Sequence, residues 1–246
     1  QLAKESQDDE IWLLARRRDR LEETKNLIEN DSSSFPKVRI FEVDLCGQSG
    51  ALQVKKLLDE EKAECGEIEI SVLVNNAGFG TYGEFSATDP VREMDMIDTD
   101  CTSLTGLTGF ALPYMKKGSR IINTASLASF CPLGNFAVYA ACKAYVLSFS
   151  VALAAELKDR GISVTALCPG PVSTEFANVA SKGARKEVRH GLSAEKTVAH
   201  CLKASRKGKL YSMWAFKWRF KAVASKILGR YMIARFTYKY CKRPSN

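Results

Sequence analysis

Short apolar runs and longer segments with helical periodicity alternate along most of the chain. Strands that alternate with helices in this way predict βαβ units, in which helices cover both faces of a parallel sheet. The pattern therefore predicts an α/β fold, with one doubly wound parallel sheet in a single domain. The predicted strands are residues 11–14, 38–43, 68–74, 120–126 and 162–167, and the predicted helices are residues 19–28, 50–63, 90–117, 136–158 and 193–204.

Polar or small residues stand at the carboxyl ends of four of the predicted strands. They are Asp44, Asn75-Asn76-Ala77-Gly78, Ser126 and Pro169-Gly170. Doubly wound sheets bind their ligands beyond the carboxyl ends of the strands. Because these residues converge on one edge of the predicted sheet, we expect the functional site there.

Ser126, Tyr139 and Lys143 form a candidate proton-transfer site. Tyr139 and Lys143 are four residues apart, so both lie on one face of the predicted helix. A phenol has an ordinary pKa of about 10, and an ammonium group one helical turn away is expected to lower that pKa. Ser126 ends a predicted strand and is placed to hydrogen-bond a substrate carbonyl oxygen that the phenol protonates.

A Tyr-x-x-x-Lys spacing also arises by chance in a chain with eight tyrosines. Tyr238 and Lys242 have the same spacing, within a basic segment that no predicted strand precedes. We therefore interpret Tyr238 and Lys242 as structural residues, and we interpret Tyr139 and Lys143 as candidates for proton transfer.

The composition is that of a globular protein and does not indicate which reaction the protein catalyses. A chain of 246 residues can bury a substantial core as one domain, and its 46% of apolar residues is ordinary for a globular protein. No apolar run reaches the ~18 residues that a membrane-spanning helix needs. The eight cysteines are scattered without zinc-ligand spacing, which disfavours a metal site and a disulfide framework. Reduced thiols are typical of a cytoplasmic protein.

Charge is divided unevenly along the chain. From Lys196 onward there are 14 lysines and arginines and no acidic residue, whereas the first 195 residues carry a net charge of −6. Three interpretations of this basic tail stay open: a helical stripe over residues 223–232 packed on the body, peripheral contact with an anionic membrane, or nucleic-acid binding. Residues 216–221 alternate apolar with basic side chains, which favours a membrane surface, and no nucleic-acid-binding module is recognisable.

The residues at the strand ends, together with Ser126, Tyr139 and Lys143, resemble the classical short-chain dehydrogenase/reductase family. The resemblance implies a Rossmann-like catalytic domain over residues 1–205 and leaves residues 206–246 as a basic, aromatic extension. It implies that Tyr139 is the general acid in reduction and the base in oxidation. Ser126 would then orient the carbonyl group, and Lys143 would bind the nicotinamide ribose.

The same resemblance assigns a cofactor site. Asn75-Asn76-Ala77-Gly78 looks like the family motif beside the adenosine half of the cofactor, and residues 169–174 look like the loop on the nicotinamide side. The cofactor-binding residues that it implies are Arg16, Asp44, Leu45, Asn75, Ala77, Gly78, Tyr139, Lys143, Pro169, Gly170, Val172 and Thr174.

Arg16 decides which cofactor we expect. It follows Ala15 at the end of the first predicted strand, where an acidic residue would accept hydrogen bonds from the adenine ribose. Arginine pairs instead with a 2′-phosphate, so we expect NADP(H). The alternative is that residues 16–18 only begin a solvated helix. Asp44 resembles the family aspartate at the adenine amino group, and it is equally a turn residue at a strand end.

Two features depart from the family pattern. Residues 1–5 look like the end of the helix that follows the family's glycine-rich loop. We therefore expect an N-terminally truncated sheet that lacks its first strand and that loop, and weak cofactor binding. Asp100 stands where many members carry an asparagine that holds a proton-relay water. Its charge is expected to raise the pKa of Tyr139, and we count Asp100 among the catalytic candidates.

The expected function is NADP(H)-dependent hydride transfer between nicotinamide and a carbonyl or secondary alcohol. An aromatic tail near a membrane would suit a hydrophobic substrate of lipid or steroid type. The alternative is a catalytically silent binding or scaffold protein that keeps the fold. The expected partners are a small-molecule substrate and further copies of the chain in a dimer or tetramer. Membrane contact through the tail stays a hypothesis, and nucleic acid is the least favoured partner.

Overall fold

The computed structural model describes residues 1–5, 8–30, 36–186, 188, 191–227 and 229–245. Their strands are all parallel and form two sheets, of two strands and of four strands in the order β3-β4-β5-β6. The strands are β1 (Glu10–Ala15), β2 (Lys37–Glu42), β3 (Val72–Asn75), β4 (Arg120–Thr124), β5 (Ser163–Leu167) and β6 (Tyr211–Ser212).

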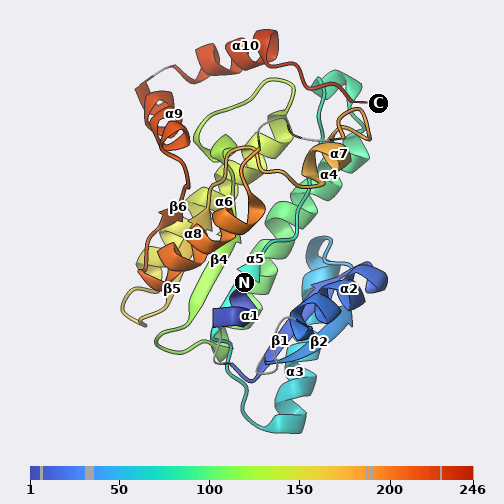
Figure 1. Ribbon diagram of the computed structural model, residues 1–246, viewed down its shortest axis with the longest axis vertical. Helices are drawn as coiled ribbons and strands as arrows, with labels where there is room; N and C mark the ends of the chain where they lie inside the picture. The colour runs from blue at the N-terminus through green and yellow to red at the C-terminus, as the bar shows by residue number, and fades with distance from the viewer. Residues whose placement is uncertain (6–7, 31–35, 187, 189–190, 228, 246) are drawn as a thin grey trace.

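Helices cover both faces of the four-stranded sheet. Helix α6 packs on β4 and β5, and α8 packs on the same two strands from the other side (Figure 1). This arrangement confirms the predicted α/β fold. The helices are α1 (Leu2–Glu5), α2 (Arg18–Glu29), α3 (Gly47–Cys65), α4 (Pro90–Ile97), α5 (Leu104–Ala111), α6 (Ala137–Glu156), α7 (Phe176–Ala180), α8 (Ala194–Arg206), α9 (Phe216–Ile227) and α10 (Arg230–Tyr240).

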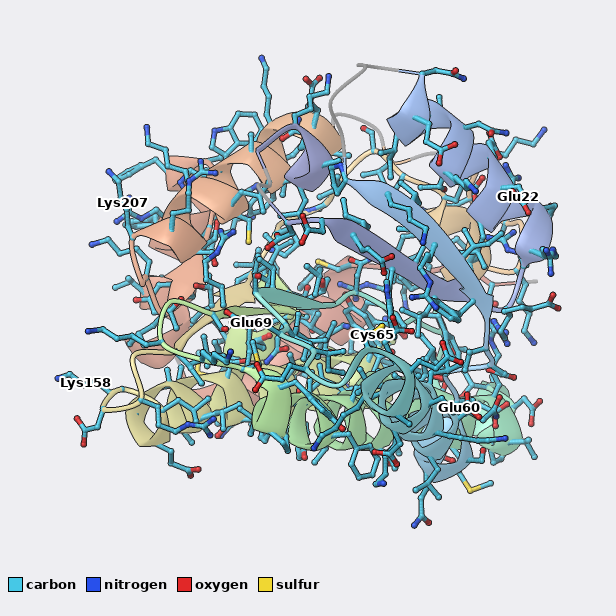
Figure 2. All side chains as sticks on the ribbon, turned by 90° about the horizontal axis from the view of Figure 1, so that it is seen from below. Glu22, Glu60, Cys65, Glu69, Lys158 and Lys207 are labelled. Atoms are coloured by element: carbon cyan, nitrogen blue, oxygen red, sulfur yellow. The ribbon has the colours of Figure 1, made fainter. Side chains whose placement is uncertain are left out.

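The two sheets are joined by a helix rather than by a strand ladder. Among the described residues, no ladder links β1 to β3, and Val74 in β3 is 42% exposed. Helix α3 closes the space between the sheets, because Val54 and Leu58 pack against Trp12 of β1 and against Leu107 of α5. In Figure 2 the labelled side chains Glu22 and Glu60 lie on the side of the molecule opposite to Lys158 and Lys207.

Local signals in the sequence explain where several helices begin. Asp89 caps α4, because its side chain accepts a hydrogen bond from Val91 N at 3.0 Å and Pro90 opens the helix. Ser193 caps α8 in the same way, by accepting from Lys196 N at 3.3 Å. The predicted long helix from residue 90 is present as α4 and α5, joined through the π-helical segment η2 (Asp98–Ser103).

The C-terminal segment differs from the predicted stripe over residues 223–232. It folds as two helices, α9 and α10, and α10 begins after Gly229. Leu228, which belongs to the predicted stripe, lies outside the described residues. Strand β6 was not predicted, because two residues are too short to show an alternating pattern.

Parallel pairing brings the carboxyl ends of the central strands level. Asn75 at the end of β3 is paired with Asn123 of β4, and Thr124 is paired with Leu167 of β5. Helix α6 is long and apolar enough to cross a membrane by composition, yet Val146 is fully buried against the sheet. We therefore interpret α6 as a core helix that carries functional side chains to the end of the sheet.

Candidate active site

Ser126 is held at the end of β4 by the turn that follows it. Its side chain caps the short 3-10 helix η4 (Leu127–Phe130) and accepts a hydrogen bond from Ala128 N at 3.1 Å. The Ser129 hydroxyl donates to the Lys143 carbonyl at 2.6 Å, which fixes this turn to α6. Ser126 and the first two turns of α6 are therefore parts of one packed unit.

Tyr139 and Lys143 project from the first turns of α6, as the spacing predicts. The Lys143 ammonium nitrogen lies 5.6 Å from the centre of the Tyr139 ring. The nearby Ser126 side chain lowers the pKa of the Tyr139 phenol and completes the set. The structure thus brings Ser126, Tyr139 and Lys143 together at the end of the sheet.

Asp100 belongs to the same site. Its Oδ2 lies 2.9 Å from Lys143 Nζ, and its Oδ1 accepts a hydrogen bond from Phe79 N at 3.0 Å. Lys143 Nζ also donates to the Thr124 carbonyl at 3.0 Å. Asp100 lies within the π-helical segment η2, a type of irregularity that is frequent at functional sites.

Burial and charge set the pKa values of these groups. Burial raises the pKa of Tyr139 above its ordinary value, Lys143 and Ser126 oppose that shift, and Asp100 adds to it. The net direction corrects our expectation from the sequence, which considered the ammonium but not the loss of water around the phenol. Burial is the largest single influence and would lower the pKa of Lys143, but Asp100 and Tyr139 beside it together outweigh burial and raise that pKa. Burial likewise raises the pKa of Asp100, against the attraction of Lys143.

Aromatic side chains enclose the phenol of Tyr139, which is 7% exposed. The Phe136 ring is stacked on it with the ring centres 4.1 Å apart, and the Phe176 ring centre lies at 5.4 Å. Tyr82 meets the far side of Phe136 edge-on at 4.8 Å. Sequence reasoning missed these residues, because the rings come from three separate segments and share no motif.

The Asn75-Asn76-Ala77-Gly78 motif divides into a buried and an exposed part. Asn75 Nδ2 donates to Thr108 Oγ1 at 3.0 Å and to Asn123 Oδ1 at 2.8 Å, so it ties β3 to α5 and β4. Ala77 and Gly78 are exposed beyond the strand end. A Cβ atom at Gly78 would lie 2.6 Å from Asp100 Oδ1, so this position needs glycine for the close approach of Asp100.

Arg16 and Asp44 lie next to each other at the ends of β1 and β2. Arg16 Nε is 3.9 Å from Asp44 Oδ1, and both side chains are exposed, so this ion pair contributes little to stability. Asp44 Oδ1 also accepts from Cys46 N at 3.1 Å, as a turn residue does, while Leu45 packs against the cluster around α3. The exposed Arg16 guanidinium is free of any close packing that would prevent it from meeting a phosphate.

The loop over residues 169–174 leaves the end of β5 and joins the unit that holds Ser126. The Pro169 carbonyl accepts from Leu127 N at 2.8 Å, and Val172 makes an isolated bridge with Leu192. Gly170 is buried beneath Trp218 of α9, where an added Cβ atom would lie 2.5 Å from the indole ring.

Thr174 closes the same loop, because its Oγ1 accepts from Phe176 N at 3.3 Å. This bond sets the start of α7, whose first residue, Phe176, lies against the Tyr139 ring. The contact between Gly170 and Trp218 could not be predicted, because it joins segments that are far apart in the chain.

A sequence model described as short chain dehydrogenase matches residues 2–185. The chain belongs to the short-chain dehydrogenase family. Members of this family are oxidoreductases that use a nicotinamide cofactor, and the Ser126, Tyr139 and Lys143 set lies inside the matched residues.

Curated relatives of this short-chain dehydrogenase match parts of its length. The NADP-dependent 3-hydroxy acid dehydrogenase YdfG of Escherichia coli K12 is 33% identical over 181 residues, which cover 72% of this chain and 68% of that protein. Serine 3-dehydrogenase of Rhizobium radiobacter is 35% identical over 118 residues, 47% of either chain. The chain spans about half the length of several of the curated relatives that it matches.

Solved structures share the fold of this short-chain dehydrogenase. A short-chain dehydrogenase from Sphingobium yanoikuyae in complex with NADPH has a TM-score of 0.74 at 24% identity, with 89% of this chain and 84% of that chain covered. A second member, from Burkholderia phymatum in complex with NAD, has a TM-score of 0.75 at 19% identity, with 96% and 88% covered.

The residues at the end of the sheet fit a nicotinamide cofactor. An ammonium group has three N–H donors, and Lys143 Nζ donates to the Thr124 carbonyl at 3.0 Å and forms an ion pair with Asp100 Oδ2 at 2.9 Å. These two partners leave donor capacity for a ribose hydroxyl. Ala77, Gly78 and Arg16 are exposed, and they follow the carboxyl ends of β3 and β1.

Proposed function

We propose that this protein is an NADP(H)-dependent oxidoreductase that interconverts a carbonyl group and a secondary alcohol. The observation that carries the proposal is the joint position of Ser126, Tyr139 and Lys143 at the end of the sheet. The effect of Ser126, which lowers the pKa of Tyr139, and the 5.6 Å approach of Lys143 to the Tyr139 ring support this role. The name of one relative, an NADP-dependent 3-hydroxy acid dehydrogenase, agrees with the reaction class.

Each side chain has a separate task in the proposed reaction. The nicotinamide cofactor, when bound, supplies the hydride in reduction and takes it up in oxidation. In reduction the Tyr139 hydroxyl donates its proton to the carbonyl oxygen, and in oxidation the phenolate accepts the alcohol proton. Ser126 holds the same oxygen by a hydrogen bond. Lys143 stays cationic beside Asp100 and stabilises the phenolate.

The surroundings of Tyr139 support a hydrophobic substrate of lipid or steroid type. Phe136, Phe176 and Tyr82 are the side chains that enclose the phenol, and an apolar substrate would gain by displacing water from them. The same rings restrict entry, so Phe176 at the start of α7 has to move before a ketone reaches the hydroxyl.

We propose NADP(H) over NAD(H) because Arg16 is exposed directly after β1. A guanidinium group in that position can bind a 2′-phosphate, for which Asp44 at 3.9 Å is a weak competitor. A relative that is named NADP-dependent and a neighbour solved with NADPH support this choice, although another neighbour was solved with NAD.

Residues 1–205 form the proposed catalytic unit, and residues 206–246 form its extension. We further propose a homodimer or homotetramer through the outer faces of α4 and α6. Large apolar side chains are exposed there, namely Val91, Met94, Ile97, Tyr145 and Val151. Light scattering of the purified protein measures the mass directly, and a monomer at micromolar concentration would contradict the oligomer. The free thiols suit a cytoplasmic location.

One observation favours a second candidate function, a silent protein that keeps the fold. The phenol is almost completely covered, and both burial and Asp100 raise its pKa. A protein of this kind would use the fold to bind a partner and would not turn over a ketone.

Fluorescence titration with NADPH, followed by a screen of ketones, separates the two functions. The chain is tested as the 246 residues and with any residues that its reading frame encodes upstream. We expect Tyr139→Phe to bind NADPH normally and to lose about a hundredfold or more in turnover. The matched control is Tyr238→Phe, a second tyrosine four residues before a lysine, which should keep full activity. If no form binds NADPH or NADH, the silent function is correct.

A further inference from the structure

Helix α9 is fixed to the body by one of its faces. Ala222 is buried in the cluster that surrounds the end of β5, and the Trp218 ring lies against Gly170. The Ser225 hydroxyl donates a hydrogen bond to the Phe130 carbonyl at 3.2 Å. These contacts determine which side of α9 points away from the protein.

Helix α10 is fixed in the same manner, to the loop that precedes α6. Gly134 N donates to Thr237 Oγ1 at 2.9 Å, and Asn135 Nδ2 donates to the Tyr238 carbonyl at 3.0 Å. Beyond the helix, Arg243 Nη1 donates to the Gly134 carbonyl at 3.0 Å. The two helices therefore keep a defined orientation along the outer edge of the molecule (Figure 1).

The opposite sides of both helices carry large apolar side chains in water. Their exposed fractions run from 58% for Phe236 to 80% for Phe216. Spacings of three and four residues place Phe216, Phe220 and Val223 on one face of α9, and Met232, Phe236 and Tyr240 on one face of α10, where Tyr231 is adjacent. The Phe236 and Tyr240 rings are 5.0 Å apart. Apolar surface gathered in this way marks an interaction site. We call these residues the outer apolar face: Phe216, Phe220, Val223, Tyr231, Met232, Phe236 and Tyr240.

The helices that carry the outer apolar face have basic residues and no acidic residue of their own. No Asp or Glu follows Glu195 in the sequence. Lys217 Nζ and Lys221 Nζ each lie 4.8 Å from the centre of the Trp218 ring, and Lys239 Nζ lies 5.3 Å from that of Tyr240. The exposed cations of the two helices are Lys217, Arg219, Lys221, Arg230, Arg235 and Lys239.

We propose that the outer apolar face of α9 and α10 docks on the surface of an anionic membrane. Aromatic and aliphatic side chains enter the boundary between headgroups and acyl chains, and the neighbouring lysines and arginines pair with lipid phosphates. Each basic residue close to such a surface contributes about fivefold to binding. The helices lie on the membrane and do not cross it, because their inner faces stay fixed to the body through Trp218 and Thr237.

Charge argues against the other occupants of this surface. A second copy that met it face to face would bring two surfaces rich in exposed cations together, and the two helices carry no acidic residue to pair with them. The phosphates of a nucleic acid would form ion pairs with the cations, but the phosphate backbone has no apolar surface against which Val223 and Met232 could pack. An anionic bilayer can bury the apolar side chains and pair its phosphates with the basic side chains. The docking is independent of the proposed reaction.

Co-sedimentation with vesicles tests the proposal on the full chain. Vesicles of phosphatidylcholine alone are compared with vesicles that also contain phosphatidylglycerol, at low and at high salt. We expect binding to the anionic vesicles, weaker binding as salt rises, and little binding to phosphatidylcholine.

Two variants measure separately how much the apolar and the basic side chains contribute to vesicle binding. The double variant Phe220→Ser with Phe236→Ser should lose at least about tenfold in binding. Arg230→Glu with Lys239→Glu should lose more, and the binding that remains should depend less on salt. The matched control is Leu27→Ser with Leu52→Ser, which removes two exposed apolar side chains from α2 and α3. Thermal unfolding of each variant verifies the fold.

Three results would overturn the docking. The first is no binding to anionic vesicles, and the second is equal loss in the control and in the Phe220/Phe236 variant. The third is a shift from dimer to monomer on mutation of Phe220 and Phe236 without lipid, together with no vesicle binding. That result, or binding to duplex DNA alone, would assign the face to a second copy or to nucleic acid.

Discussion

Lys143 Nζ lies 2.9 Å from Asp100 Oδ2, and both side chains are almost completely buried. In many members of the family that the sequence resembles, an asparagine stands at the position of Asp100. A carboxylate there balances the ammonium charge that would otherwise act on Tyr139. The pair therefore keeps Lys143 protonated. Asp100 also raises the pKa of Tyr139, so the phenolate is less stabilised.

Asp100→Asn should shift the pH dependence of alcohol oxidation to lower pH. Oxidation needs the phenolate of Tyr139, so its rate rises as the pH approaches the pKa of that group, which Asp100 now raises. Removing the carboxylate lowers that pKa and increases the fraction of phenolate at a given pH. Rate profiles of the two proteins across pH measure the shift. Asp98→Asn, an exposed change in the same π-helical segment, should leave the profile in place.

The same substitution should cost about 1–3 kcal/mol in the free energy of unfolding, because Lys143 loses its charged partner inside the protein. Urea denaturation measures this cost. An unchanged stability together with an unchanged pH profile would show that the buried pair does not act on the phenol.

Arg16→Ala should reduce the preference for NADPH over NADH by about tenfold or more, the value of one charge-assisted hydrogen bond. The ratio of the two dissociation constants, from fluorescence titration, measures the effect. Arg18→Ala is the matched control, because Arg18 is equally exposed but pairs with Glu22 within α2. If the two variants lower the ratio equally, Arg16 does not contact the 2′-phosphate.

Gly170→Ala should destabilise the protein by about 1–3 kcal/mol, because the new methyl group overlaps the Trp218 ring and displaces α9. Gly109→Ala is the control, since a Cβ atom there meets nothing within 4 Å and alanine favours the helix. Denaturation curves compare the two. In a Trp218→Ala background the penalty at Gly170 should disappear, and a penalty that persists would place its cause elsewhere.

Phe176→Ala should increase kcat/KM for bulky ketones more than for small ones. The ring lies 5.4 Å from that of Tyr139, and its removal opens a path to the phenol. Exposure to water should also lower the pKa of Tyr139, because burial is the largest cause of its rise. Steady-state rates with a series of ketones check both effects. Phe85→Ala, an exposed change in the 3-10 helix before α4, should alter neither.

The local parts of the fold and of the site could be predicted from the sequence. Tyr139 and Lys143 share a helix face because four residues make about one turn, and Ser126 is near them because it ends a strand beside that helix. The cap at Ser193 and the start of α4 at Pro90 were predictable in the same way. Each of these features depends on neighbours within a few residues.

Only the tertiary structure decided how these parts act. The contact of Phe176 with Tyr139, the ion pair of Lys143 with Asp100 and the contact of Trp218 with Gly170 each join distant segments. The pKa of Tyr139 shows the consequence, because the sequence supplied the nearby ammonium but not the burial that outweighs it. Spacing along the chain determines which groups can meet, whereas their distance from water and from other charges is set by packing over the whole fold.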